Sequence, residues 1–274
     1  MNQAKNKDYL LGINQSELER LRFQQTVWGP VTNSLFDRIG VTTGWRCLDV
    51  GAGPGLVSSE LRTRVGEGGE VTALEPGEFY RGTFAQEIEN RRWTNVRIIN
   101  GPAEEAALPE GHYDLVFIRW VASFVPDLEK FMLRLFTALR PGGVIAIQDY
   151  YYEGLALHPR GGPWDRMPDV VRAYYRYGNG DPYVSGKLPA LFREHGIRLT
   201  EFHPTQLAGG PDSGVFGWAD RFFTVYTPIM AEKGVITQHQ AKELMADWVA
   251  HRNNPDAIFF SPIVVDVAGV LEKK

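Results

Sequence analysis

The feature that most constrains the fold is a regular alternation of short apolar runs with longer amphipathic segments between residues 45 and 149. The apolar runs have the length of strands and occupy residues 46–50, 71–74, 96–99, 115–118 and 144–148. Helices are predicted between them at 56–65, 79–91 and 128–139, and Arg140-Pro141-Gly142-Gly143 is expected to end the last. This order is typical of an α/β fold with a parallel sheet between helices.

The segments on either side of this region are less regular. Ser16 and Glu19 form a capping-box pattern that predicts a helix, and Gly29-Pro30 is expected to end it before a second helical stretch at 32–39. Residues 150–181 are rich in aromatic, Gly, Pro and Arg residues without a clear period, as in a lid or substrate loop. Further elements are predicted as helices at 188–195, 218–232 and 238–250 and as extended segments at 197–202 and 263–270.

We therefore expect one domain, residues 1–274, with four parts. A helical cap would span 1–44, a cofactor-binding core 45–149, a lid or substrate segment 150–196, and C-terminal strands and helices 197–274. The sequence leaves the oligomeric state open.

Charge and composition exclude several classes of function. The net charge is −4, so the chain lacks the excess of Lys and Arg that binding to nucleic-acid phosphates requires. Its single cysteine, Cys47, lies in an apolar run and is interpreted as a buried thiol, and no residues have metal-ligand spacing. The polar N-terminus has no apolar core of a signal peptide, and no stretch reaches membrane-spanning length. A cytoplasmic setting without membrane insertion is expected.

The segment 47–56 is an apolar strand that leads through a glycine-rich turn into a helix. Glycines tolerate positive φ and let backbone N–H groups approach a ligand at the positive end of the helix. The spacing Gly51-x-Gly53-x-Gly55 differs from the Gly-x-Gly-x-x-Gly of dinucleotide folds, and Asp49 would repel a pyrophosphate. An NAD-dependent oxidoreductase is therefore disfavoured.

Asp49 to Gly55 resembles the first motif of class I S-adenosylmethionine-dependent methyltransferases, and later segments match in the same order. The nearest subgroup is the small-molecule one that includes quinone-biosynthesis C-methyltransferases. The resemblance implies a Rossmann-like doubly wound sheet of seven mostly parallel strands, an N-terminal helical cap and inserted lid helices. It makes Glu75 the acidic residue that binds both ribose hydroxyls, and 100–104 the adenine-binding turn. The cofactor contacts that it implies are Asp49, Gly51, Ala52, Gly53, Gly55, Glu75, Pro76, Pro102, Ala103, Glu104, Arg119 and Trp120.

The resemblance implies an enzyme that methylates a small, aromatic or hydrophobic metabolite at oxygen, nitrogen or carbon. The alternative is a protein of this fold that binds S-adenosylmethionine without methyl transfer, as a cyclisation catalyst or regulatory module. The sequence departs from relatives where they carry a His-His or Gln-His pair, because Ser123-Phe124 stands there. Base-directed amino-methyltransferases are disfavoured, because the chain lacks an Asn/Asp-Pro-Pro-Tyr motif after the fourth strand.

The general base and the substrate contacts are predicted from position alone. Asp149 and His158 follow the fifth strand, where ligands of open α/β sheets bind, and are the candidate bases. Relatives use an N-terminal segment to cap the pocket, which makes Tyr9 and Trp28 cap candidates, although packing of the first helix is the favoured interpretation of both. Tyr151 is a further candidate beside the acceptor. Further candidates after the fifth strand are Tyr150, Tyr152, His195 and His203. The lid aromatics suit a flat or hydrophobic acceptor or pack the lid itself: Trp164, Tyr174, Tyr175, Tyr177 and Tyr183.

Overall fold

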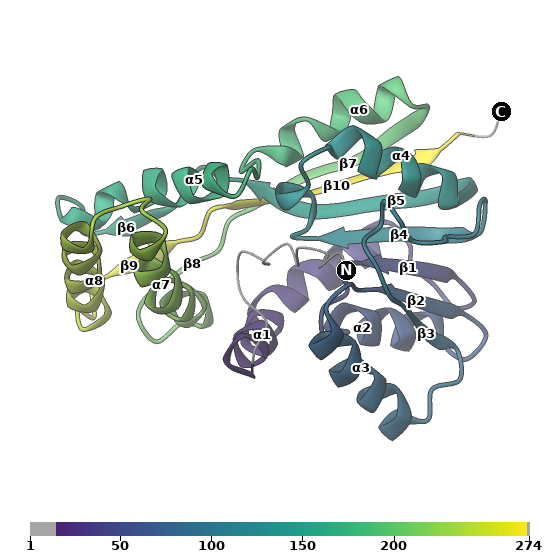
Figure 1. The fold of residues 1–274 in the computed structure, drawn as a ribbon, viewed down its shortest axis with the longest axis horizontal. Helices are drawn as coiled ribbons and strands as arrows, with labels where there is room; N and C mark the ends of the chain where they lie inside the picture. The colour runs from purple at the N-terminus through teal and green to yellow at the C-terminus, as the bar shows by residue number, and fades with distance from the viewer. Residues whose placement is uncertain (1–14, 273–274) are drawn as a thin grey trace, which may run out of the picture.

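The computed structural model describes residues 15–272 and is built on a seven-stranded sheet of order β3-β2-β1-β4-β5-β10-β7 (Figure 1). Strands β1 to β5 are parallel, and β10 is antiparallel to both β5 and β7. The strands are β1 (Arg46–Val50), β2 (Glu70–Leu74), β3 (Val96–Ile99), β4 (Tyr113–Arg119), β5 (Leu139–Tyr151), β7 (Ile197–Thr205) and β10 (Ile263–Leu271). The predicted α/β fold with a mostly parallel sheet is confirmed.

Helices cover both faces of this sheet because side chains alternate along each central strand. Leu48 points to the face covered by α4 (Leu128–Ala138) and α6 (Leu188–Glu194), with which it shares an apolar core. Cys47, the neighbouring residue, is fully buried on the opposite face. That face is covered by α2 (Leu56–Val65), α3 (Glu78–Arg91) and the C-terminal end of α1 (Gln15–Arg38) (Figure 1).

A second lobe lies beyond the end of β5 and contains a three-stranded sheet of order β6-β9-β8 (Figure 1). Its core is aromatic, with the rings of Trp164 and Phe216 stacked on Trp248 at 5.6 and 4.7 Å. Its elements are β6 (Ala156–His158), β8 (Ala208–Gly209), β9 (Ile258–Phe260), α5 (Met167–Tyr177), α7 (Gly214–Glu232) and α8 (Gln238–Arg252). The strands of this sheet have two or three residues each, too few to show a period, so the sheet was not predicted from the sequence.

Short 3₁₀ helices complete the connections: η1 (Ala122–Phe124), η2 (Pro163–Arg166) and η3 (Val184–Gly186). Within residues 15–272, no helix is both long enough and apolar enough to cross a membrane.

The structure corrects the predicted limits of one helix and the turn predicted after another, whose own end at Ala138 agrees with the prediction to within one residue. α1 is continuous through Gly29 and Pro30, and Gln15 is already helical, so neither the predicted break nor the N-cap at Ser16 is observed. Packing explains the continuity, because Trp28 is fully buried with its ring against those of Trp120 and Trp218. Residues 140–143, predicted as a turn, belong to β5, which begins at Leu139. β5 pairs with β4, and the register shifts at a bulge between Tyr113 and Leu115.

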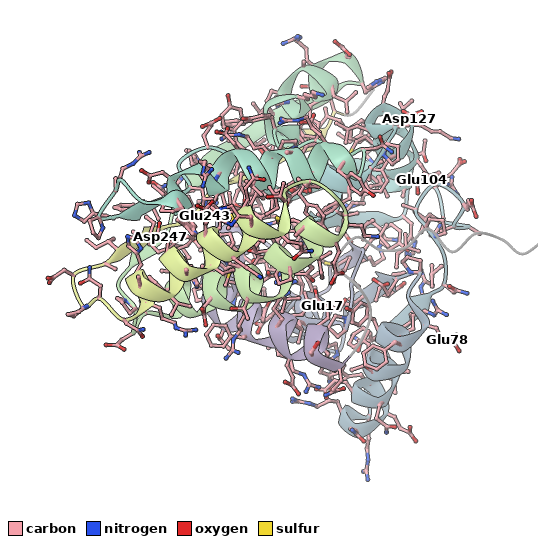
Figure 2. All side chains as sticks on the ribbon, turned by 60° about the vertical axis from the view of Figure 1, so that its left-hand side comes forward. Glu17, Glu78, Glu104, Asp127, Glu243 and Asp247 are labelled. Carbon is pink, nitrogen blue, oxygen red and sulfur yellow. The ribbon has the colours of Figure 1, made fainter. Side chains whose placement is uncertain are left out.

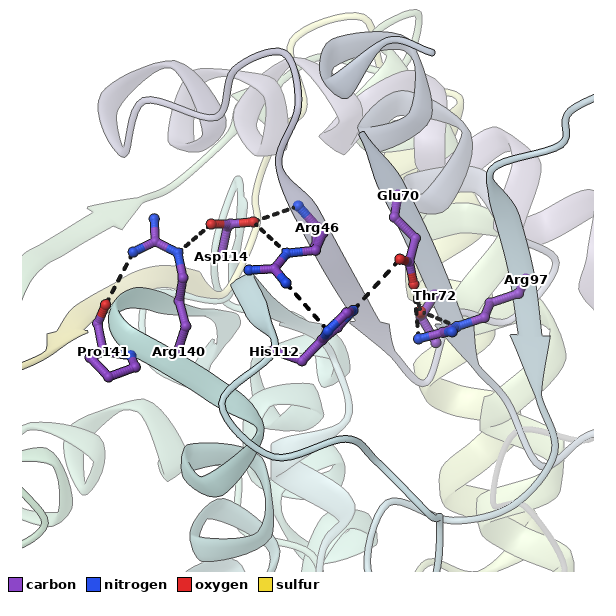
Figure 3. Close-up of polar contacts among 8 residues, drawn as sticks. All are labelled: Arg46, Glu70, Thr72, Arg97, His112, Asp114, Arg140 and Pro141. Carbon is purple, nitrogen blue, oxygen red and sulfur yellow. Dashed lines mark hydrogen bonds and ion pairs between the residues drawn. The ribbon is translucent and has the colours of Figure 1, made fainter. Parts of the chain in front are cut away.

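Polar contacts tie together the amino ends of the parallel strands (Figure 3). Asp114 of β4 accepts a hydrogen bond from the backbone N–H of Arg46 at 2.7 Å and forms an ion pair with Arg140 of β5. Burial alone would raise the pKa of Asp114, but these contacts outweigh it and lower the pKa. This cluster holds together the amino-terminal ends of the strands. The cavity described below lies at their carboxyl ends.

Candidate cofactor and acceptor site

A cavity of about 900 Å³ lies at the carboxyl ends of the parallel strands, where ligands of open α/β sheets bind. One group of lining residues follows strands β1 to β4, at 49–54, 56–57, 74–81, 100–104 and 119–121. A second group comes mostly from α1, α5, α7 and the end of β5, and we call it the aromatic wall. It consists of Arg20, Leu21, Gln24, Phe124, Tyr150, Tyr174, Tyr175, Trp218 and Phe222.

The glycine-rich turn after β1 forms part of the cavity lining. Gly51, Gly53 and Gly55 all have positive φ, and the N–H of Gly51 donates to the carbonyl oxygen of Leu74 at 2.8 Å. A Cβ atom on Gly53 would meet no protein atom within 4 Å. The turn therefore exposes its backbone at Gly53.

Gly55 has a different role from the one that the resemblance implied. It does not line the cavity, and a Cβ atom there would collide with the ring of Phe84 on α3. Gly55 thus allows α2 to pack closely, which is the role of the third glycine in a dinucleotide fold.

Glu75 lies at the end of β2 between two loops of the cavity. Its carboxylate accepts hydrogen bonds from the backbone N–H groups of Gly53 at 2.8 Å and of Gly77 at 2.7 Å. Burial raises the pKa of Glu75, and these hydrogen bonds partly offset that effect. Each carboxylate oxygen has a further lone pair for a ligand hydroxyl. The other predicted contacts of this region, Pro76, Pro102, Ala103 and Glu104, also line the cavity.

Asp49 and Arg119 place opposite charges in the floor of the cavity. The Asp49 carboxylate is 2% exposed and accepts a hydrogen bond from the Ser58 hydroxyl at 2.6 Å. Burial raises the pKa of Asp49 to about 6, and Arg119 acts against this rise. A carboxylate held here suits a cationic ligand group, such as the amino group of an amino acid.

Arg119 donates to Thr32 Oγ1 at 3.0 Å and to Gln25 Oε1 at 2.7 Å, and it forms no ion pair within residues 15–272. Burial lowers its pKa to about 10. Its guanidinium lies 4.9 Å from the ring centre of Trp120, which has a φ of 53°. Positive φ is unusual for a bulky residue and is found where a site fixes the backbone.

The two predicted bases do not reach the cavity. Asp149 is fully buried, and its carboxylate accepts hydrogen bonds from the backbone N–H groups of Ser123 at 3.1 Å and Tyr150 at 2.8 Å. Burial raises its pKa to about 6. His158 is exposed on β6 and does not line the cavity. In this structure, the base proposed from sequence position is therefore supplied by neither side chain.

Trp28 and Tyr151, two of the predicted cap and substrate residues, also lie off the cavity. Trp28 is buried behind Trp120 and Trp218, which do line it. Tyr151 is 41% exposed and packs against the ring of Tyr183. Tyr9 lies outside the described residues. Within residues 15–272, no three His, Cys, Asp or Glu side chains gather in a way that could hold a metal ion.

Arg20, Gln24 and the two α7 residues of the aromatic wall were not predicted from the sequence. The spacing of Glu17, Arg20, Gln24 and Trp28 is that of one helix face and could have revealed the α1 contribution. Figure 2 shows Glu17 on α1, with Glu78 and Glu104 on other segments near the cavity.

Residues 48–147, which contain the glycine turn, Glu75 and Arg119, match the family described as Methyltransferase domain. This stretch, a little over a third of the chain, is similar to methyltransferase domains. S-adenosylmethionine is the cofactor that this similarity implies, and the residues present fit it. An acidic pair, Asp49 and Glu75, faces the space beside the open backbone of Gly53.

Curated relatives match part of the chain. Nocamycin O-methyltransferase of Saccharothrix syringae is 33% identical over 43% of this chain and 42% of its own length. Demethylmenaquinone methyltransferase of Listeria welshimeri is 28% identical over 50% of this chain and 54% of its own length. The chain thus spans about half the length of these relatives or less.

A solved structure from Bacillus halodurans C-125, described as a methyltransferase, matches with a TM-score of 0.62 at 18% identity. The match covers 88% of this chain and 98% of that one. This similarity concerns the fold alone. The shared fold extends well beyond residues 48–147, the segment that matches the family.

Proposed function

We propose that this protein transfers the methyl group of S-adenosylmethionine to a small, flat or hydrophobic metabolite, at oxygen, nitrogen or carbon. The position of Glu75 carries the proposal, because its carboxylate joins the glycine turn to the loop after β2 inside the cavity. The names of the two curated relatives, for nocamycin and demethylmenaquinone, support an organic acceptor of this kind.

We assign one group of cavity residues to binding of the cofactor and the other, the aromatic wall, to orientation of the acceptor. When bound, S-adenosylmethionine supplies an electrophilic methyl group on its sulfonium sulfur. Glu75 would bind the ribose hydroxyls, Asp49 the amino group, and the turn at 100–104 the adenine. The aromatic wall would exclude water and hold the acceptor close to that methyl group, and such positioning can supply much of the rate enhancement. The wall residues contain no carboxylate or histidine, and we assign them the orientation of the acceptor.

We extend the proposal to the organisation of the protein. Residues 1–274 would act as one domain, in the cytoplasm and on a ligand other than nucleic acid. The net charge of −4 and the buried thiol of Cys47 support the ligand class and the compartment. Gel filtration with light scattering would determine the oligomeric state.

A labelled-cofactor experiment tests the proposal. Purified protein is first titrated with S-adenosylhomocysteine by calorimetry, where we expect a dissociation constant in the micromolar range or tighter, about −8 kcal/mol. It is then incubated with methyl-labelled S-adenosylmethionine and a panel of phenols, naphthols and quinones, and label should appear in an acceptor. A protein that binds the cofactor but never moves label would be the non-transferring alternative, and one that binds only NAD would overturn both.

A further inference from the structure

The side chain of Gln24 has its orientation fixed by two neighbours on the aromatic wall. Its Oε1 accepts hydrogen bonds from Arg20 Nη1 at 2.9 Å and from Trp218 Nε1 at 3.0 Å. A guanidinium and an indole can only donate, so the amide oxygen must face them and not the amide nitrogen. The neighbours therefore leave a single amide orientation for Gln24.

The amide nitrogen of Gln24 is left without a protein partner. Gln24 is 7% exposed and lines the cavity, yet its Nε2 makes no hydrogen bond within residues 15–272. Nε2 is not among the fully enclosed polar atoms, so it is open to the cavity. A ligand that filled the cavity would bury it, and a buried donor without a partner costs about 1–3 kcal/mol. An acceptor atom on that ligand would complete the hydrogen bonding of Nε2.

The rest of the wall restricts what that ligand can be. Arg20 is held by Glu17, which accepts from its Nε at 2.8 Å and its Nη2 at 2.7 Å, so its charge is already balanced (Figure 2 shows the place of Glu17). Phe124 and Tyr175 stack with ring centres 5.2 Å apart. The described wall residues include no carboxylate, so the wall offers hydrogen-bond donors and flat apolar surface.

We propose that Gln24 is a specificity-determining residue that donates a hydrogen bond from Nε2 to an oxygen of the methyl acceptor. The acceptor class is then a flat, largely apolar ring compound that carries a carbonyl, enolate or phenolate oxygen. This proposal rests on the proposed function, because it assigns the aromatic wall to the acceptor and the turn, Glu75 and Asp49 to the cofactor.

A matched pair of probes tests it. Full-length protein saturated with S-adenosylhomocysteine is titrated with 1-tetralone and with tetralin, which share the ring frame and differ by one carbonyl oxygen, and tryptophan fluorescence reports binding. We expect 1-tetralone to bind about fivefold to tenfold more tightly, as one hydrogen bond allows. Gln24→Glu keeps an oxygen for Arg20 and Trp218 but removes the donor, and Gln24→Met removes it without adding charge. In both variants the ratio should fall to about one, with tetralin affinity nearly unchanged.

Controls separate this proposal from the proposed function. Gln86→Glu adds the same charge on an exposed part of α3 that does not line the cavity, and it should keep the wild-type ratio. Equal affinities of the two probes for the wild type, or no binding of either, would overturn the acceptor class while S-adenosylhomocysteine binding still stands. A Gln24→Met variant that loses tenfold in S-adenosylhomocysteine affinity but keeps the probe ratio would place Gln24 with the cofactor and also overturn it.

Discussion

The Glu75 carboxylate and the backbone N–H of Gly53 are joined by a hydrogen bond of 2.8 Å, although one ends β2 and the other belongs to the turn after β1. The second carboxylate oxygen accepts from Gly77 at 2.7 Å. A single side chain therefore positions two backbone segments of the cavity. Its substitution should affect both ligand binding and the order of the turn.

Replacement of Glu75 by Gln should weaken S-adenosylhomocysteine binding at least tenfold. The change removes a charged acceptor, and each charge-assisted hydrogen bond contributes about 1.5–3 kcal/mol. The melting temperature without ligand should also fall, because one of the two backbone N–H groups then faces an amide NH₂ group. Calorimetry and thermal unfolding measure the two effects. Glu78→Gln removes the same charge from an exposed cavity residue and should change neither by much, so equal losses in both variants would contradict this role.

A side chain on Gly53 should block the cofactor, because its Cβ atom would project into open cavity space. Gly53→Ala also forces alanine into the left-handed region at φ 55°, which costs about 1–2 kcal/mol of stability. Gly111→Ala is the matched control, because Gly111 has φ 58° and open space around its Cβ but does not line the cavity. Both variants should lose similar stability, and only Gly53→Ala should lose at least tenfold in S-adenosylhomocysteine affinity by calorimetry. If folded Gly53→Ala protein bound S-adenosylhomocysteine with unchanged affinity, the glycine-rich turn would not be part of the cofactor site.

The stability of the ligand-free protein should depend on pH through Asp49. Burial raises the pKa of its carboxyl from 3.8 to about 6, so its contribution to stability is full below about pH 4 and is lost as the pH rises through 6. A shift of about two pKa units corresponds to about 3 kcal/mol. Asp49→Asn removes this titration, so urea unfolding at pH 4.5 and pH 7.5 should show a smaller loss of stability in the variant. Parallel pH profiles of the two proteins would rule this explanation out.

Asp149→Asn distinguishes a structural residue from a general base. Each carboxylate oxygen of Asp149 accepts one backbone N–H, and asparagine can accept only one of them, so stability should fall by about 1–3 kcal/mol. The rate of methyl transfer per folded molecule should fall less than tenfold. Loss of a general base would cost about 100-fold or more. If the rate of methyl transfer by fully folded Asp149→Asn protein fell 100-fold or more, Asp149 would be the general base.

Local patterns allowed the sheet and the cavity-lining residues Gly51, Gly53 and Glu75 to be predicted, because strand, turn and helix follow one another within a few residues around them. The continuity of α1 could not be read in the same way. Pro30 is a local helix-breaking signal, and the buried contacts of Trp28 that override it come from Trp120 and Trp218, which are remote in sequence. The pairing of Gln24 with Trp218 joins positions 194 residues apart, so no local period could indicate it.

The segment that matches the methyltransferase family, residues 48–147, contains the cofactor turn and Glu75 but none of the wall residues on α1, α5 and α7. If the wall binds the acceptor as proposed, acceptor choice and cofactor use are encoded largely in separate stretches of the chain, with Phe124 as the wall residue inside the matched segment. A lineage could exchange the side chains at positions 24, 174 and 218 and acquire a new acceptor while the glycine turn stayed intact. Divergence of substrate under a constant cofactor would then require few substitutions, and these three positions all lie outside the segment by which such proteins are grouped.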